Sequence, residues 1–489
     1  MLLIAACLAA AACNSSGDRT ATCGPLTGTA ITAAHAAGPA RLCGRLQIAA
    51  DAAARDATGP IVLSWFRPDE QKRFRGGRLP PNDLLEALME RGRIVTGARL
   101  ARGGVEYSLD YPGGVAVVLA IADLRHDFWA TLFGGGAGNF VGVSAVGGAR
   151  ARTDVPLELV TEHDPGPPPE RCQGARFELV KIDAPEVAGA IGNDTARRLC
   201  VWLPASYAAE PARRYPVVYI LPGFASGDVA YLVGNRDLRK TADALAHDGA
   251  GEAILVGVDT ATRHGSTYFT DSAAGGAWAR FVRERMVPEI DHRYRTVATS
   301  AGRAVLGHST GGFNAISLAL RFPDLFGTAA ASAPDPLDFE GWMLGPDGRV
   351  RPRWLAWTRL EAAVGGIGQM VSYAAAWSAE APPSPRAYPF DLETGAVRAA
   401  DWAAWRAQSP LRLLDDPDRV AAIRSNLDGR IFITVGKADE FGLFEPAQRF
   451  SARLAELGIA HELHATEGTH GGDQTAGLQA ALTFAIRRR

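Results

Sequence analysis

The sequence carries almost no excess charge of either sign. Lysine and arginine number 51 and aspartate and glutamate 53, giving a formal net charge of −2 over 489 residues. Without a basic excess, neither nucleic acid nor an anionic membrane is expected as the main partner. A hydrophobic fraction of 47% with 21% charged residues is typical of a soluble globular protein. The length predicts more than one domain.

The apolar run at the N-terminus is short. Residues 1–12 read MLLIAACLAAAA, too few to span a bilayer but similar to the hydrophobic region of a secretory signal. Cys7 and Cys13 each follow small residues, as in a bacterial lipoprotein signal, and Cys13 has the better downstream linker. We therefore expect residues 1–22 to be a leader, and the protein to be periplasmic, anchored to the outer membrane through a lipidated Cys13, or extracellular. A frayed apolar terminus is the alternative.

Cysteine is also scarce. Beyond the leader there are Cys23, Cys43, Cys172 and Cys200, which allow three pairings. The local pairs Cys23–Cys43 and Cys172–Cys200 are the simplest, and free buried cysteines are the alternative. The four do not form a CxxC motif and the chain lacks HExxH, so we expect neither a metal nor a cofactor.

Residues 23–163 are predicted to form a β-rich, sandwich-like domain, because short strand patterns alternate with turn signals. The strands are expected at 60–66, 105–111, 115–121 and 157–160, and a short helix at 80–91. The proline-rich residues 164–171 are expected to be a linker.

Residues 172–489 alternate between apolar strands and helices. The strands are predicted at 215–221, 253–258, 303–308 and 430–435, and the helices at 238–247, 276–290, 312–321 and 445–457. Strands that are apolar on both faces belong in a parallel sheet covered by helices, so we predict a doubly wound, mostly parallel α/β domain. The tryptophan-rich residues 334–410 are expected to be an irregular insertion that caps this sheet.

The sequence around Ser309 fits the pattern G-x-S-x-G. Gly307 and Gly311 flank the serine, an apolar strand precedes it and a helical pattern follows. This motif places a nucleophilic serine on a sharp turn between a strand and a helix, where both glycines must be small. Ser309 is therefore predicted to be a nucleophile, with a glycine-rich turn as the alternative.

An acid and a histidine follow in the order that this fold uses. Asp439 comes after the strand at 430–435, and His470 follows a strand at 461–465. Loops after parallel strands meet at one edge of the sheet, so Ser309, Asp439 and His470 are predicted to form a triad. Glu440 is the rival acid.

A loop after the first long strand is predicted to complete the site. An oxyanion hole needs one backbone N–H from the residue after the nucleophile and one from such a loop. These are Thr310 and Phe224, with Gly223 allowing close approach of the backbone. An ordinary turn after the strand is the alternative.

Three segments resemble the esterase D-like family of the α/β-hydrolase superfamily. They are Tyr215–Phe224 (YPVVYILPGF), Val287–Thr296 (VPEIDHRYRT) and Gly307–Gly312 (GHSTGG). The family includes feruloyl and acetylxylan esterases, enterochelin esterases, S-formylglutathione hydrolase and the mycolyltransferases. The resemblance implies a triad of serine, acid and histidine. It also suggests that Asp271–Trp278 lines the substrate cleft. Gly223, Ser272 and His308 are candidate substrate contacts, with packing inside the turn as the favoured alternative for His308.

These features together predict a serine carboxylesterase that acts through an acyl-enzyme, on a small-molecule or polysaccharide-linked ester. Acyl transfer of the mycolyltransferase type is the second enzyme hypothesis. A glycan-binding protein on a hydrolase scaffold is the third hypothesis, because aromatic residues on a β-sandwich can stack on sugars. The aromatic residues in question are Trp65, Tyr107, Tyr111 and Trp129.

Overall fold

The computed structural model describes residues 29–30, 40–48, 57–66, 93–100, 105–111, 116–122, 140–146, 154–159, 172–226, 231–232 and 237–488. They fall into two compact units, one within residues 1–165 and 351–370 and the other within 166–350 and 371–489. The predicted leader at 1–22, Cys23, the helix at 80–91, Trp129 and the linker at 164–171 lie outside these described residues, and the side chain of Tyr111 is not described.

The N-terminal unit is rich in β-structure, as predicted. Its strands are β1 (Thr29–Ala30), β2 (Ala40–Ile48), β3 (Ala57–Phe66), β4 (Arg93–Leu100), β5 (Val105–Tyr111), β6 (Ala116–Ala122), β7 (Phe140–Val146) and β8 (Val155–Leu159). They pair in the order β1-β4-β3-β6-β7-β8-β2-β5. Trp65 and Tyr107 are buried. These two aromatic rings therefore belong to the core and do not form a surface for stacking on sugars.

The second unit contains an eight-stranded sheet in the order β20-β19-β18-β17-β11-β12-β10-β9. Its strands are β9 (Phe177–Asp183), β10 (Ala196–Trp202), β11 (Val217–Leu221), β12 (Ile254–Val258), β17 (Arg303–His308), β18 (Thr328–Ser332), β19 (Ile431–Gly436) and β20 (Glu462–Thr466). The strands from β20 to β12 pair in parallel, and β10 pairs antiparallel with both β12 and β9. The predicted mostly parallel α/β sheet is confirmed.

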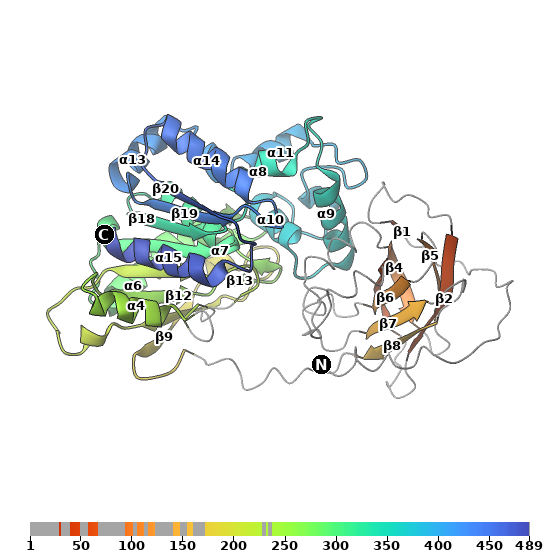
Figure 1. Ribbon diagram of the computed structural model, residues 1–489, viewed down its shortest axis with the longest axis horizontal. Coiled ribbons are helices and arrows are strands. Elements are labelled where there is room, and N and C mark those ends of the chain that lie inside the picture. Colours follow the sequence, from red (N-terminus) through yellow and green to blue (C-terminus); the bar gives the residue numbers. More distant parts are fainter. Residues whose placement is uncertain are drawn as a thin grey trace. The chain divides into compact units, whose positions relative to one another are not determined.

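Helices cover both faces of this sheet (Figure 1). On one face, α15 (Gln474–Arg487) packs against β17, β18 and β19 and beside α4 (Leu238–His247). On the other, α7 (Thr310–Arg321) packs against β11, β17 and β18. Every residue of β11, β12, β17, β18 and β19 is buried, which is why these strands read as continuous apolar runs.

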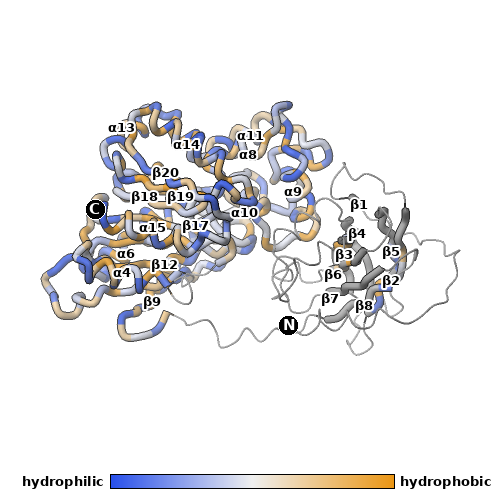
Figure 2. The backbone as a smooth tube through the Cα atoms, in the orientation of Figure 1, coloured by the Kyte–Doolittle hydropathy of each residue, from blue (hydrophilic) through white to orange (hydrophobic). Residues whose placement is uncertain are grey.

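The remaining elements of the second unit connect these strands. They are η2 (Pro185–Val187), η3 (Ala205–Tyr207), β13 (Ala261–Thr262), β14 (Gly265–Ser266), β15 (Asp271–Ser272), β16 (Gly276–Ala277), α5 (Trp278–Phe281), η5 (Val282–Met286), α6 (Val287–Arg293), η6 (Ser300–Gly302) and α14 (Phe444–Glu456). The helix predicted at 276–290 is observed from 278 to 293, and its middle turn, η5, is π-helical. Along α14, hydrophobic and hydrophilic residues are interleaved, as expected of a helix with one buried face (Figure 2).

The long segment between β18 and β19 is helical. It contains α8 (Phe339–Met343), α9 (Pro352–Val364), α10 (Gln369–Trp377), η7 (Pro385–Ala387), α11 (Ala399–Arg406), α12 (Pro410–Leu413) and α13 (Pro417–Leu427). The expectation that 334–410 is irregular was therefore wrong, while its role as a cap stays a prediction. Tryptophans hold several of these helices together: the rings of Trp377 and Trp405 lie 5.2 and 5.8 Å from that of Phe339. No helix among the described residues is long and apolar enough to cross a membrane.

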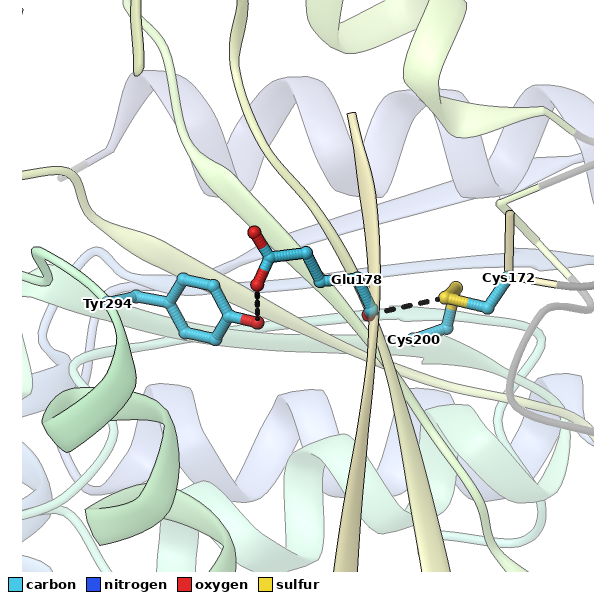
Figure 3. The surroundings of a disulfide bond; sticks show 4 residues. All are labelled: Cys172, Glu178, Cys200 and Tyr294. Atoms are coloured by element: carbon cyan, nitrogen blue, oxygen red, sulfur yellow. Dashed lines mark hydrogen bonds between the residues drawn. A yellow bond between two sulfur atoms is a disulfide. The ribbon is translucent and has the colours of Figure 1, made fainter. Parts of the chain in front are cut away.

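A disulfide between Cys172 and Cys200 joins the start of the second unit to β10, with the two Cα atoms 5.5 Å apart (Figure 3). Glu178 in β9 lies beside it, and the hydroxyl of Tyr294 donates to the Glu178 carboxylate at 2.8 Å. The local pairing predicted for Cys172 and Cys200 agrees with this geometry. Cys43 lies buried in β2.

Candidate active site

Ser309 lies on the turn between β17 and α7. Its backbone angles are φ 57° and ψ −126°, a strained conformation for a residue with a side chain. A Cβ atom on Gly311 would lie 2.1 Å from the carbonyl oxygen of Leu221, and one on Gly307 would lie 2.4 Å from the Gly311 backbone. Only glycine fits at these positions. This steric requirement explains the G-x-S-x-G pattern and raises the serine hydroxyl above the edge of the sheet.

Two loops bring His470 and Asp439 to this hydroxyl. Ser309 Oγ lies 3.0 Å from His470 Nε2, and His470 Nδ1 lies 2.8 Å from Asp439 Oδ2. Asp439 follows β19 and His470 follows β20, so both stand at the carboxyl edge of the sheet, where α/β sites form. The Asp439 side chain is fully buried and that of His470 is 13% exposed. The structure thus brings the three residues of the predicted triad into one hydrogen-bonded chain.

Glu440 contacts His470 differently. Its carboxylate accepts a hydrogen bond from the backbone N–H of His470 at 2.9 Å, while the imidazole ring is bonded to Asp439. Between the two candidate acids, Asp439 is the one placed to fix the tautomer and orientation of the ring. Glu440 anchors the backbone of the histidine loop.

Acidic neighbours control the pKa of His470. Burial by itself lowers this pKa, but the hydrogen bond that His470 donates to Asp439 and the charges of Asp439, Asp335 and Glu440 outweigh it, and the pKa is raised above its usual value of 6.5. An imidazole in this setting is a stronger base. The same charges stabilise the imidazolium that forms when it accepts a proton.

The loop after β11 lies against Ser309. A Cβ atom on Gly223 would lie 3.8 Å from Ser309 Cβ. The N–H of Gly223 donates to the hydroxyl of Tyr231 and that of Ala225 to Ser266 Oγ, both at 3.0 Å. Phe224 lies between these two anchored residues. Its N–H and that of Thr310, the first residue of α7, stay the predicted oxyanion donors.

The other predicted substrate contacts fall in different settings. His308 is buried, with Nδ1 3.1 Å from Ser332 Oγ and its ring centroid 4.7 Å from that of His470. Ser272 donates to the carbonyl oxygen of Ala375 and accepts from the N–H of Gly275, each at 2.8 Å. These hydrogen bonds to the backbone give Ser272 a structural role. Contacts of Gly223, Ser272 and His308 with substrate stay predictions.

Asp335, which is not among the predicted site residues, also contacts Ser309. It follows β18, is 6% exposed, and its Oδ1 lies 3.3 Å from Ser309 Oγ. The sequence feature that could have identified Asp335 is its position as an acidic residue just after a strand, at the carboxyl edge of the sheet. That strand, Thr328–Ser332 (TAAAS), was itself not predicted, because alanine has little β-propensity.

A mostly parallel sheet with a strained serine at the end of β17, and a histidine and an acid in later loops, defines an α/β-hydrolase. Comparison of the sequence with known families identifies the family within this superfamily. The chain belongs to the Putative esterase family, whose model matches residues 192–485.

Similar proteins include esterases. Esterase Rv1288 of Mycobacterium tuberculosis is 26% identical over 293 residues, which are 55% of this chain and 51% of that protein. The uncharacterized protein YjcH of Bacillus subtilis is 28% identical over 139 residues, 28% of this chain and 55% of YjcH. The chain thus spans about half the length of these curated relatives.

Solved structures of similar shape include a ferulic acid esterase, with a TM-score of 0.44 and 17% identity over 65% of this chain and 100% of that one. An S-formylglutathione hydrolase from Agrobacterium tumefaciens has a TM-score of 0.43 and 17% identity, over 65% of this chain and 97% of its own.

Proposed function

We propose that this protein is a serine carboxylesterase in which Ser309 is the nucleophile, His470 the general base and Asp439 the orienting acid. The observation that carries the proposal is the chain of hydrogen bonds from Ser309 Oγ to His470 Nε2 and from Nδ1 to Asp439. Family membership supports the same reaction.

The proposed reaction has two steps, acylation of Ser309 and hydrolysis of the acyl-enzyme. His470 accepts the proton of Ser309 as Oγ attacks the ester carbonyl carbon, and the N–H groups of Phe224 and Thr310 stabilise the oxyanion. Collapse of this tetrahedral intermediate breaks the bond to the alcohol oxygen, which takes its proton from His470. Water, deprotonated by His470, then attacks the acyl-Ser309 ester and releases the carboxylic acid with regeneration of the serine.

A panel of chromogenic esters tests this proposal. Acetyl to long-chain acyl esters and a feruloyl ester are offered to the wild type, to Ser309→Ala and to Ser317→Ala as a matched control. Ser317 is a buried serine of α7 whose hydroxyl accepts from Arg321 at 3.2 Å. We expect Ser309→Ala to lose turnover and Ser317→Ala to keep it. Turnover at the wild-type rate in folded Ser309→Ala would reject the proposal.

We further propose that the protein is exported, acting on an ester carried by a small molecule or a polysaccharide. The pair Cys172–Cys200 supports export, because disulfides form and persist in oxidising compartments. The leader-like residues 1–22, with Cys13 as a lipidation site, support it as well. Fractionation of a producing bacterium tests this. Enzyme confined to the cytoplasm with free thiols would contradict it.

A further inference from the structure

Asp335 is a buried carboxylate beside the reacting oxygen, and the triad does not use it. Its Oδ1 lies 3.3 Å from Ser309 Oγ, and its backbone N–H donates to the carbonyl oxygen of Ser309 at 3.1 Å. An acyl group on Ser309 is bonded directly to Oγ. The carbonyl carbon of any acyl group on Ser309 must therefore lie close to the Asp335 carboxylate.

Hydroxyl groups surround the other carboxylate oxygen. Asp335 Oδ2 accepts from Thr310 Oγ1 at 2.8 Å and from the hydroxyls of Tyr268 and Tyr373 at 3.3 Å each. Burial raises the pKa of Tyr268 well above its usual value, with the charge of Asp335 adding to the effect, so this phenol stays a donor. Hydrogen bonds donated to a carboxylate favour its ionised form and do not cancel its charge.

The tyrosines are held in place by aromatic packing. The rings of Tyr268 and Tyr373 lie 4.6 Å apart, and each contacts Trp377, at 5.2 and 4.6 Å. Tyr268 also meets Phe313 of α7 edge-on at 5.5 Å. These rings come from the loop after β14, from α7 and from α10, so the fold holds the hydroxyls around Asp335 in fixed positions.

We propose that Asp335 determines acyl specificity, selecting acyl groups that carry a hydroxyl or ammonium group over those that carry a carboxylate. The proposal rests on the proposed role of Ser309. A hydroxyl or ammonium group can donate to the carboxylate, whereas a second negative charge nearby is repelled by the buried charge of Asp335. Asp335 contacts Ser309 Oγ, so in the acyl-enzyme its carboxylate lies close to the first atoms of the acyl group.

The surrounding charges reinforce this selection. The titratable groups that face His470 are Asp439 and Glu440 from the loop after β19, Asp335 from the loop after β18, and His308 from the end of β17. The three carboxylates make the site acidic. Because the charge of Asp335 helps to raise the pKa of His470, loss of that charge also has a kinetic signature.

Specificity ratios test the proposal. Four 4-nitrophenyl esters have short linear acyl chains of equal length that end in methyl, hydroxyl, ammonium or carboxylate, so that the end group stays near Ser309 Oγ. In the wild type we expect kcat/KM for the carboxylate ester to be lower than for the methyl ester by on the order of tenfold or more, and the ammonium ester to be favoured. Asp335→Asn should bring the rates for both charged esters closer to that for the methyl ester, by about threefold or more, with Asp439 and Glu440 maintaining the remaining difference. A ratio of two substrates does not depend on how much of a variant is folded.

Asp338→Asn is the matched control. Asp338 is equally buried and lies in the same loop, but its carboxylate caps α8 at Gly341 and pairs with Arg449. Its substitution should leave the ratios unchanged. In Asp335→Asn, the acid limb of the pH profile of kcat/KM should also move to lower pH, which a merely structural role would not cause.

Equal use of carboxylate and methyl esters by the wild type would overturn the proposal even if Asp335→Asn failed to fold. Unchanged ratios in a folded Asp335→Asn would overturn it as well. If one of these two results is found and Ser309→Ala is inactive, the specificity role of Asp335 is rejected and the proposed function is kept. If Ser309→Ala stays active, the proposed function itself fails.

Discussion

Replacing Asp439 with asparagine keeps the size of the side chain and removes its charge. Asp439 is fully buried and 2.8 Å from His470 Nδ1, so the lost contact is a charge-assisted hydrogen bond of about 1.5–3 kcal/mol. At 1.36 kcal/mol for each factor of ten in rate, this alone lowers kcat by roughly 10- to 150-fold. An asparagine that donates to Nδ1 also leaves the proton on Nε2, which then cannot accept from Ser309. A fall in kcat of about 10³- to 10⁴-fold is therefore expected, in line with the same change in serine proteases.

Steady-state hydrolysis of a 4-nitrophenyl ester measures this loss, with Glu440→Gln as the matched variant. Glu440 holds the backbone N–H of His470, a bond that glutamine can also accept, so Glu440→Gln should lower kcat by no more than about tenfold. Circular dichroism of both variants checks that they are folded. If Glu440→Gln were the inactive variant and Asp439→Asn kept near wild-type kcat, the assignment of the acid would be wrong.

Three further outcomes are expected. Gly311→Ala should destabilise the fold by about 3 kcal/mol or more in urea unfolding, because its Cβ would overlap the Leu221 carbonyl oxygen, and wild-type stability would contradict the geometry. As pH falls, kcat/KM should decline through a pKa above 6.5, since protonated His470 cannot act as a base, and a limb below 6.5 would conflict with its acidic surroundings. Replacing Cys172 and Cys200 together with serine should lower the unfolding free energy by roughly 2–4 kcal/mol while activity at low temperature persists, and unchanged stability would argue against the disulfide.

The parts of the site that depend on local geometry could be predicted from the sequence. Gly307 and Gly311 are required by steric contacts within the turn itself, so the motif identifies Ser309 without knowledge of the rest of the fold. Asp439 and His470 could be predicted because each lies in the loop that follows a strand of the parallel sheet. Parallel pairing brings those strand ends to one edge, whatever the details of packing.

Features that depend on distant segments could not be predicted. The alanines of β18 form a strand because they lie in the middle of the sheet, between β17 and β19, and not because of their own propensity. The hydrogen bonds that surround Asp335 come from Tyr268 and Tyr373, which the sequence places on separate segments. The tryptophans of the insertion did not show a clear helical period, and their ring contacts appear only in the folded chain.

The central claim is that Ser309 forms a covalent intermediate, and labelling tests it most directly. The protein is treated with a fluorophosphonate, which reacts with activated serines, and the modified peptide is identified by mass spectrometry. We expect one adduct, on Ser309, and we expect it to be absent from Ser309→Ala and strongly reduced in His470→Ala. An adduct on a different residue, or none on folded wild-type protein that still hydrolyses esters, would contradict the account.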